Sequence, residues 1–173
     1  MSSHTSAGCK QQTSGFTGSF MMSSSDKNNC DAYGKKWFGA SSGAPFNGKK
    51  GGVYALQWDS NGVKVFHWLR GSIPSDVTSG KPNPSSKWGQ PENFVAAGGC
   101  SPFKHFTDLM LVINTNLCGT WGSGVWSQDL SYAGGKGSCA AITGYSTCEA
   151  YVKSNGSKMK DMYWQINSIK YYQ

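Results

Sequence analysis

The sequence predicts an all-β protein, a sandwich or jelly roll of several strands with one short helix. The composition is rich in turn formers, with 23 glycines among 173 residues, and only 14% of the residues are charged. Aromatic residues make up 13% of the chain, and strands favour such side chains. The stretch VYALQWDSNGVKVFHWL at 53–69 is typical of two paired strands around a tight turn. A helical bundle would instead be rich in Ala, Glu, Lys and Leu.

The hairpin is the element with the strongest local signal. Period-two alternation over 52–58 places Tyr54, Leu56 and Trp58 on one face of a strand, and residues 63–69 form the return strand. Asn61-Gly62 between them predicts a type I′ turn, because both central residues of that turn need positive φ.

Further strands are predicted with weaker signals. Short strands are expected near 15–22. Leu109–Asn114 is a nearly continuous apolar run, which predicts a strand buried on both faces. Tyr163–Tyr172 predicts a long closing strand, with Trp164 and Ile166 opposite Tyr163 and Gln165.

The rest of the chain predicts loops and one helix. Residues 71–93 carry four prolines, and residues 119–137 are rich in glycine, so both predict long loops. Residues 147–154 predict the helix, because Thr147 can cap its first turn and Asn155-Gly156 can end it. No repeat or domain boundary interrupts the sequence, so residues 1–173 predict a single β-jelly-roll-like domain. No stretch approaches the length of a membrane span.

The cysteines predict disulfide bonds and an oxidising compartment. Their number is even, and the local pair Cys9–Cys30 is the favoured single bridge among many pairings. No C-x-x-C pair and no zinc-finger spacing of histidines is present, so neither a metal nor a cofactor is predicted. The sequon Asn155-Gly156-Ser157 is compatible with secretion, although residues 1–25 contain no signal-peptide hydrophobic region. The six candidates for disulfide bonds are Cys9, Cys30, Cys100, Cys118, Cys139 and Cys148.

The basic residues predict a positively charged surface rather than a nucleic-acid site. The net charge is +7, carried by lysines scattered along the chain and by the one arginine, Arg70. A nucleic-acid-binding protein usually clusters its basic residues and includes arginines for bidentate contacts. Binding of nucleic acid is therefore kept only as an alternative function.

The acidic residues predict no catalytic pair. The two glutamates are Glu92, in the proline-rich loop, and Glu149, in the first turn of the predicted helix. Asp59 lies at the hairpin and Asp76 is expected to turn the following loop. No G-x-S-x-G nucleophile elbow is present either. We therefore assign no catalytic residue from the sequence.

Two tryptophans are candidate platforms for sugar rings. An exposed aromatic face suits a pyranose, whose axial C–H edges are apolar and weakly positive. Trp121 lies in GTWGSG, where its small neighbours lack the bulk to bury it, and Trp126 follows in the same predicted loop.

Six segments together resemble the C-terminal part of fungal glycoside hydrolase family 16, the laminarinase-like and mixed-linkage endo-β-glucanases. They are HTSAGC (4–9), GGVYALQWDSNGVKVFHWLRGSIPSDV (51–77), PSSKWGQP (84–91), NLCGTWGSGVW (116–126), TCEAYV (147–152) and DMYWQINSIKYYQ (161–173). The resemblance implies a concanavalin A-like jelly roll, truncated on its N-terminal side. It also implies a secreted, extracellular protein.

The resemblance also implies which residues would catalyse the reaction and which would contact the sugar. Family members carry a Glu-x-Asp-x-x-Glu strand whose two glutamates act as nucleophile and acid/base, the pair that retaining hydrolysis needs. That strand would precede the segment matched by HTSAGC, where this chain has Met1-Ser2-Ser3. The resemblance places His4 beside the acid/base, Trp121 at a sugar subsite and Arg70 in a family-like segment. Trp68-Leu69 and Thr120 depart from the family pattern.

We therefore expect a non-catalytic, lectin-like protein that binds β-1,3 or mixed-linkage glucan oligosaccharides. Its expected carbohydrate contacts are His4, Arg70, Trp121 and Trp126. A jelly roll without some of its strands exposes sheet edges, which favours a homodimer. Three alternatives remain. They are an endo-β-glucanase or a fragment of one, a fungal defence or immunomodulatory interaction protein, and a protein that binds nucleic acid.

Overall fold

The computed structural model describes residues 5, 8–10, 13–18, 43–84, 86–129, 131 and 136–173. Two compact units divide the chain, Met1–Leu109 and Met110–Gln173, and each is described by itself. His4 and Cys30, which carry sequence predictions, lie outside the described residues. The single-domain organisation stays a prediction.

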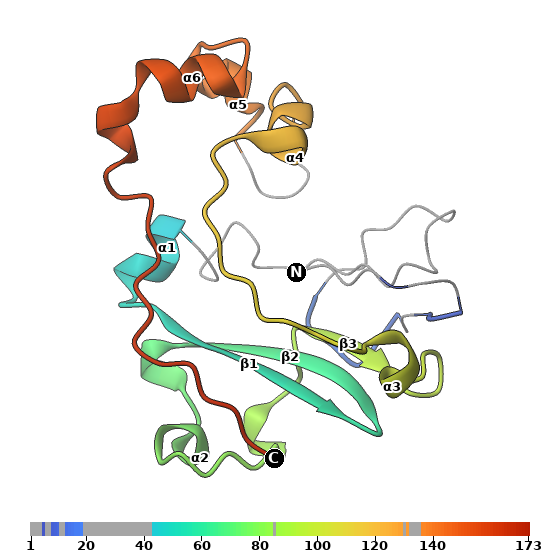
Figure 1. Ribbon diagram of the computed structural model, residues 1–173. Helices are drawn as coiled ribbons and strands as arrows, with labels where there is room; N and C mark the ends of the chain where they lie inside the picture. The colour runs from blue at the N-terminus through green and yellow to red at the C-terminus, as the bar shows by residue number, and fades with distance from the viewer. Residues whose placement is uncertain are drawn as a thin grey trace. The chain divides into compact units, whose positions relative to one another are not determined.

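A three-stranded antiparallel sheet forms the centre of the first unit (Figure 1). Strand β1 (Gly52–Asp59) pairs with β2 (Gly62–Leu69), and β2 pairs with β3 (Asn93–Ala96). The predicted hairpin is therefore confirmed. Helix α1 (Gly43–Gly48) precedes the sheet, and α3 (Pro102–His105) follows β3.

The hairpin turn differs from the predicted type. Asp59 pairs with Gly62, so Ser60 and Asn61 form the turn. The backbone of Asn61 does not take the positive φ that a type I′ turn requires. The Asn61 N–H donates to Asp59 Oδ1 at 2.7 Å, an Asx turn that organises the loop without a left-handed asparagine. Gly62 alone takes positive φ, at 143°. The predicted type I′ turn centred on Asn61-Gly62 is wrong.

One face of the sheet carries the small buried core of the first unit. Val63 and Val95 pack with Cys9 and Cys100, and Phe106 joins them. The strand register places Tyr54, Leu56 and Trp58 on this same face, as their alternation predicted. Their side chains nevertheless remain 40–59% exposed, so the core covers only the β3 side of the face.

The opposite face carries an aromatic cluster. Phe66 and Trp68 of β2 stack with ring centroids 5.6 Å apart. Trp88, from the 3-10 turn η3 (Ser86–Trp88), meets both rings edge-on at 5.0 Å. The chain reaches Trp88 through η2 (Arg70–Ser72), α2 (Ser75–Thr78) and the predicted proline-rich loop.

Asp76 fixes the shape of this loop, as the sequence predicted. Its Oδ2 accepts hydrogen bonds from Asn83 N and from Trp88 Nε1, both at 2.7 Å. The Asn83 backbone donor, together with the Trp88 indole, lowers the pKa of Asp76 below its ordinary value of 3.8.

Replacing Asp76 by asparagine should lower stability at neutral pH, because the charge-assisted bonds to Asn83 and Trp88 are lost. A lowered pKa contributes stability that is present above the ordinary pKa and is lost as the pH falls through the lowered one. The gap between the wild type and Asp76→Asn should therefore be constant at neutral pH and shrink in acid below about pH 4. Urea titrations followed by tryptophan fluorescence at several pH values measure this gap. A gap that does not depend on pH would contradict the assignment.

An N-terminal segment lies antiparallel beside residues 91–100. The Lys10 N–H donates to Gly99 O at 2.8 Å, and the N–H groups of Thr17 and Gly18 donate to Pro91 O and Glu92 O at 2.9 and 3.1 Å. A disulfide joins Cys9 to Cys100, a partner 91 residues away. The predicted Cys9–Cys30 bridge is wrong, because the antiparallel alignment brings Cys9 opposite Cys100. Residues 13–18 form bends instead of the predicted strand, and 19–22 lie outside the described residues.

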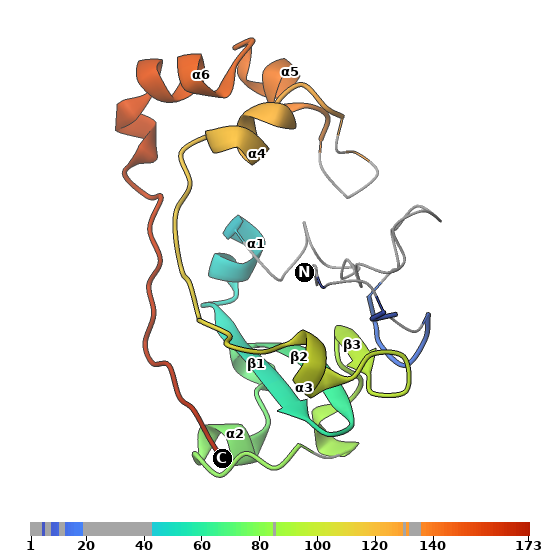
Figure 2. The same cartoon turned by 45° about the vertical axis from the view of Figure 1, so that its right-hand side comes forward.

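Short helices dominate the second unit (Figure 2). They are α4 (Gly119–Gly124), α5 (Cys139–Thr143), α6 (Cys148–Ser154) and the 3-10 turn η5 (Gly156–Met159). Helix α6 has the predicted ends, since the Thr147 side chain accepts from Ala150 N at 3.2 Å and Asn155 is the C-cap. The prediction of a single helix is wrong. Helix α4 replaces the predicted loop because Cys118 and Gly119, both with positive φ, turn the chain into it.

The two apolar segments of the second unit form no strand. Residues 110–114 and 163–172 belong to no helix or strand, and their large apolar side chains are 42–83% exposed. Trp164 Nε1 donates to Asn114 O at 2.9 Å, a side-chain bond and not a strand pairing. The predicted strands at Leu109–Asn114 and Tyr163–Tyr172 are therefore wrong. An apolar run predicted the first strand and alternation of side chains predicted the second, but neither segment pairs with a strand in the part of the chain that the structure describes.

A second disulfide joins Cys118 to Cys148, and Cys139 is the free cysteine among those that the structure describes. No helix within the described ranges has the length and apolarity to cross a bilayer.

Candidate carbohydrate-binding site

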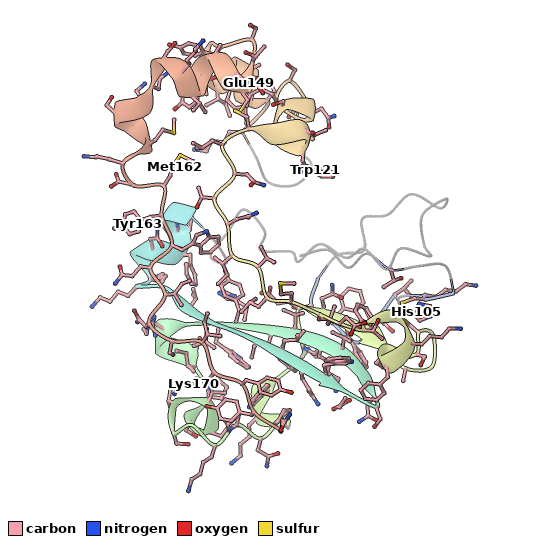
Figure 3. The ribbon with its side chains drawn as sticks, in the orientation of Figure 1. His105, Trp121, Glu149, Met162, Tyr163 and Lys170 are labelled. Atoms are coloured by element: carbon pink, nitrogen blue, oxygen red, sulfur yellow. A yellow bond between two sulfur atoms is a disulfide. The ribbon has the colours of Figure 1, made fainter. Side chains whose placement is uncertain are left out.

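Trp121 is the predicted site residue that the structure exposes most clearly. It lies on α4, and 77% of it is accessible to solvent (Figure 3). Its neighbours on α4 are glycine, serine and threonine, as the sequence argument required. An indole presented in this way can stack on the apolar face of a flat ring.

Helix α4 is held to the start of α6 at two points. The disulfide between Cys118 and Cys148 joins the residue before α4 to the first residue of α6. The Ser123 hydroxyl near the end of α4 donates to the Glu149 carboxylate. This hydrogen bond, together with the Glu149 backbone N–H, lowers the pKa of Glu149. The position of Trp121 is thus fixed by a covalent bond on one side and a charge-assisted bond on the other.

The side chain of Trp126 takes part in the packing of the second unit. Its Nε1 donates to Tyr145 O at 2.8 Å, and its ring lies 5.8 Å from that of Tyr151. Tyr145 and Tyr151 in turn meet edge-on at 5.5 Å. The half-buried indole therefore packs α6 against the segment after α4. Its predicted contact with sugar stays a prediction.

Arg70 is exposed and closes the base of the hairpin. Its Nε donates to Lys50 O at 3.1 Å, and its backbone N–H donates to Gly51 O at 2.9 Å. Lys50 and Gly51 both take positive φ, so the arginine stabilises a tight bend before β1. A role in binding sugar stays a prediction, as does that of His4.

Sequence reasoning missed a cluster around Glu92. His67 Nδ1 lies 3.5 Å from Glu92 Oε1, and both side chains are at least nine-tenths buried. The Tyr54 ring lies 4.8 Å from the His67 ring, and burial together with the Glu92 charge raises the pKa of Tyr54. The observed strand register pairs Tyr54 with His67, a pair that the predicted turn centred on Asn61-Gly62 would not have given. Glu92 comes from an irregular loop, so its position had no signal in the sequence.

Two further carboxylates, those of Asp59 and Asp129, serve local structure. Burial would raise the pKa of Asp59, but hydrogen bonds from Asn61 and Gln57 and the nearby Lys64 lower it. Asp129 accepts from the N–H and hydroxyl of Ser131, which lower its pKa. These are the ordinary roles of turn residues. No group of three side chains suited to a metal ion occurs within the described ranges.

Solved structures define the class of protein to which this architecture belongs. GH16 Laminarinase 16A from Phanerochaete chrysosporium, solved with 6-O-glucosyl-laminaritriose, aligns with a TM-score of 0.60 and 28% identity. That alignment covers 86% of this chain and 51% of the other. An elongating family 16 β-1,3-glucosyltransferase aligns at 0.61 and 29% over 72% of this chain and 42% of its own. These neighbours are jelly-roll β-sandwiches, of which the three-stranded sheet represents a part.

The sequence comparisons identify the family. The XgeA-like catalytic domain of family 16 matches residues 1–172. An endo-1,3(4)-β-glucanase of Arthroderma benhamiae and one of Emericella nidulans are each 34% identical over 98% of this chain. This chain belongs to glycoside hydrolase family 16. It spans 37% and 26% of the lengths of those two relatives.

Proposed function

We propose that this chain acts in the hydrolysis of 1,3(4)-β-glucan, as part of a family 16 endoglucanase, and that Trp121 binds a sugar ring. The match of the XgeA-like catalytic domain to residues 1–172 carries the proposal. The relatives named as endo-1,3(4)-β-glucanases support a hydrolase better than they support the lectin-like protein expected from the sequence. The exposed indole of Trp121 adds a surface suited to a pyranose.

Binding without hydrolysis is the second candidate function. One observation favours it, because the 173 residues contain no Glu-x-Asp-x-x-Glu and only two glutamates. Retaining hydrolysis needs two carboxyl groups about 5 Å apart. Glu92 is buried against His67, and Glu149 is hydrogen-bonded to Ser123, so each described glutamate has a structural partner.

Two measurements on the same samples distinguish these functions. Calorimetric titration with laminarin oligosaccharides measures binding, and the release of reducing sugar from laminarin and lichenan measures hydrolysis. Binding with release supports the glucanase. Binding without release supports the lectin-like protein. Absence of both would overturn the proposal and turn attention to the remaining expectations, a protein-interaction or defence role and nucleic acid.

Trp121→Ala should weaken glucan binding by about tenfold or more, because a tryptophan at the centre of a contact commonly carries more than 1.4 kcal/mol. Trp164→Ala is the matched control, since Trp164 is also exposed and lies outside the predicted contacts. Titration of both variants against the same oligosaccharide measures the difference. Equal affinity in the two variants would remove Trp121 from the site.

We propose an extracellular location from the two disulfides and the family, since such bonds persist in oxidising compartments. The homodimer stays a prediction, which light scattering at micromolar concentration tests.

A further inference from the structure

The single sequon of the chain has an unusual position. N-glycosylation of Asn-x-Ser needs the asparagine amide to be accessible, and acceptor sites ordinarily lie on the surface. Asn155 is instead only 7% exposed. Gly156 and Ser157, the other two residues of the sequon, are exposed in η5. In the folded chain, Ser157 of the sequon is therefore exposed to solvent and Asn155 is buried.

The amide of Asn155 is engaged at the C-terminus of α6. Its Nδ2 donates to Tyr151 O at 2.8 Å, which satisfies a carbonyl of the last helical turn. The Asn155 N–H donates to Val152 O at 3.3 Å, and its carbonyl accepts from Lys158 N at 2.9 Å. Three hydrogen bonds therefore fix this one residue between α6 and η5.

Asn155, the C-cap of α6, is also connected to the aromatic side chains of the second unit through Tyr151. Tyr151, which accepts the Asn155 amide, contacts the rings of Trp126 and Tyr145. The disulfide to Cys118 holds the other end of α6. Moving Asn155 to the surface therefore requires the last turn of α6 to open.

We propose that Asn155 accepts an N-glycan only before α6 forms, and that the folded second unit protects it. In the modification, Nδ2 attacks the anomeric carbon of a lipid-diphosphate-linked oligosaccharide. A C–N bond forms, the bond from the anomeric carbon to the diphosphate oxygen breaks, the lipid diphosphate leaves and the amide loses one proton. A sugar on Nδ2 has no room in the native position of a residue that is 93% buried, so the glycan and the native C-cap exclude each other.

The test is glycan occupancy of the full chain secreted from a eukaryotic host behind an added signal peptide. The wild type should show no mass change on treatment with peptide-N-glycosidase. Cys118→Ala, which removes the disulfide that holds α6, should slow folding and bring a glycan onto Asn155. Ile169→Thr is the positive control, because it creates a sequon at the exposed Asn167 and should be glycosylated there.

Two results would overturn the proposal. One is a glycan on Asn155 in wild-type protein whose Cys118–Cys148 disulfide is shown to be intact by non-reducing peptide mapping. The other is an unmodified Asn155 in Cys118→Ala while Asn167 of the Ile169→Thr chain is modified. Glucan binding is not used as a readout, so either result leaves the proposed function untouched.

Discussion

Removing the disulfide between Cys9 and Cys100 should lower the free energy of unfolding by about 4–5 kcal/mol, the largest loss that we expect from any one site. The bond closes a loop with a sequence separation of 91, and the entropy that a cross-link removes from the unfolded chain grows with loop length. Both cysteines also belong to the small buried core, at 0% and 2% exposure. Typical domains have only 5–15 kcal/mol in total, so the loss would be a large fraction of the stability.

The double variant Cys9→Ala, Cys100→Ala measures this effect in urea titrations, with alanine chosen so that no hydroxyl is buried. Cys139→Ala is the control, since Cys139 is free among the described cysteines and only half-buried. It should change stability by less than about 0.5 kcal/mol, as surface substitutions usually do. A loss below about 1 kcal/mol in the double variant would contradict the entropic argument.

Gly62→Ala should destabilise the first unit by about 3 kcal/mol, because two costs combine at this position. A Cβ on Gly62 would lie 2.2 Å from Val95 O and 3.0 Å from Ala96 Cα, so β2 and β3 could not keep their pairing. The φ of 143° is also one that residues with a side chain rarely adopt.

Three alanine variants separate the two costs when their urea midpoints are compared with that of Gly62→Ala. Gly52→Ala brings a Cβ to 2.0 Å from Trp68 O without a positive φ, and Gly144→Ala has a φ of 73° with no atom within 4 Å. Gly71→Ala has neither and should be close to neutral. If Gly62→Ala were no more harmful than Gly71→Ala, the close approach of β2 and β3 would be wrong.

Local signals account for the parts of the fold that the sequence predicted. The β1–β2 hairpin follows from the alternation over 52–58 and from the turn residues between the two strands, and α6 follows from Thr147 and Asn155 at its ends. The turn type was missed because Asp59 competes for the Asn61 N–H, which favours an Asx turn over the asparagine-glycine geometry.

Long-range contacts account for what the sequence could not give. Cys9 finds Cys100 through the antiparallel alignment of two segments, and no spacing rule encodes that alignment. Helix α4 forms in a glycine-rich stretch of low helix propensity because the bond to Cys148 and the contact to Glu149 hold it. Exposure of Trp121 was predictable from its small neighbours, whereas the burial of Glu92 against His67 depended on a loop.

The two disulfides also set how the chain would respond to mechanical load. A force that pulls on the chain ends passes directly from Cys9 to Cys100 and from Cys118 to Cys148, so the residues between each pair carry no tension. At about 3.4 Å per residue, the Cys9–Cys100 disulfide excludes roughly 300 Å of chain from extension, and the Cys118–Cys148 disulfide excludes roughly 100 Å. The whole β1–β2 hairpin would therefore carry no tension under a force that extends the segment between Cys100 and Cys118 and the residues after Cys148.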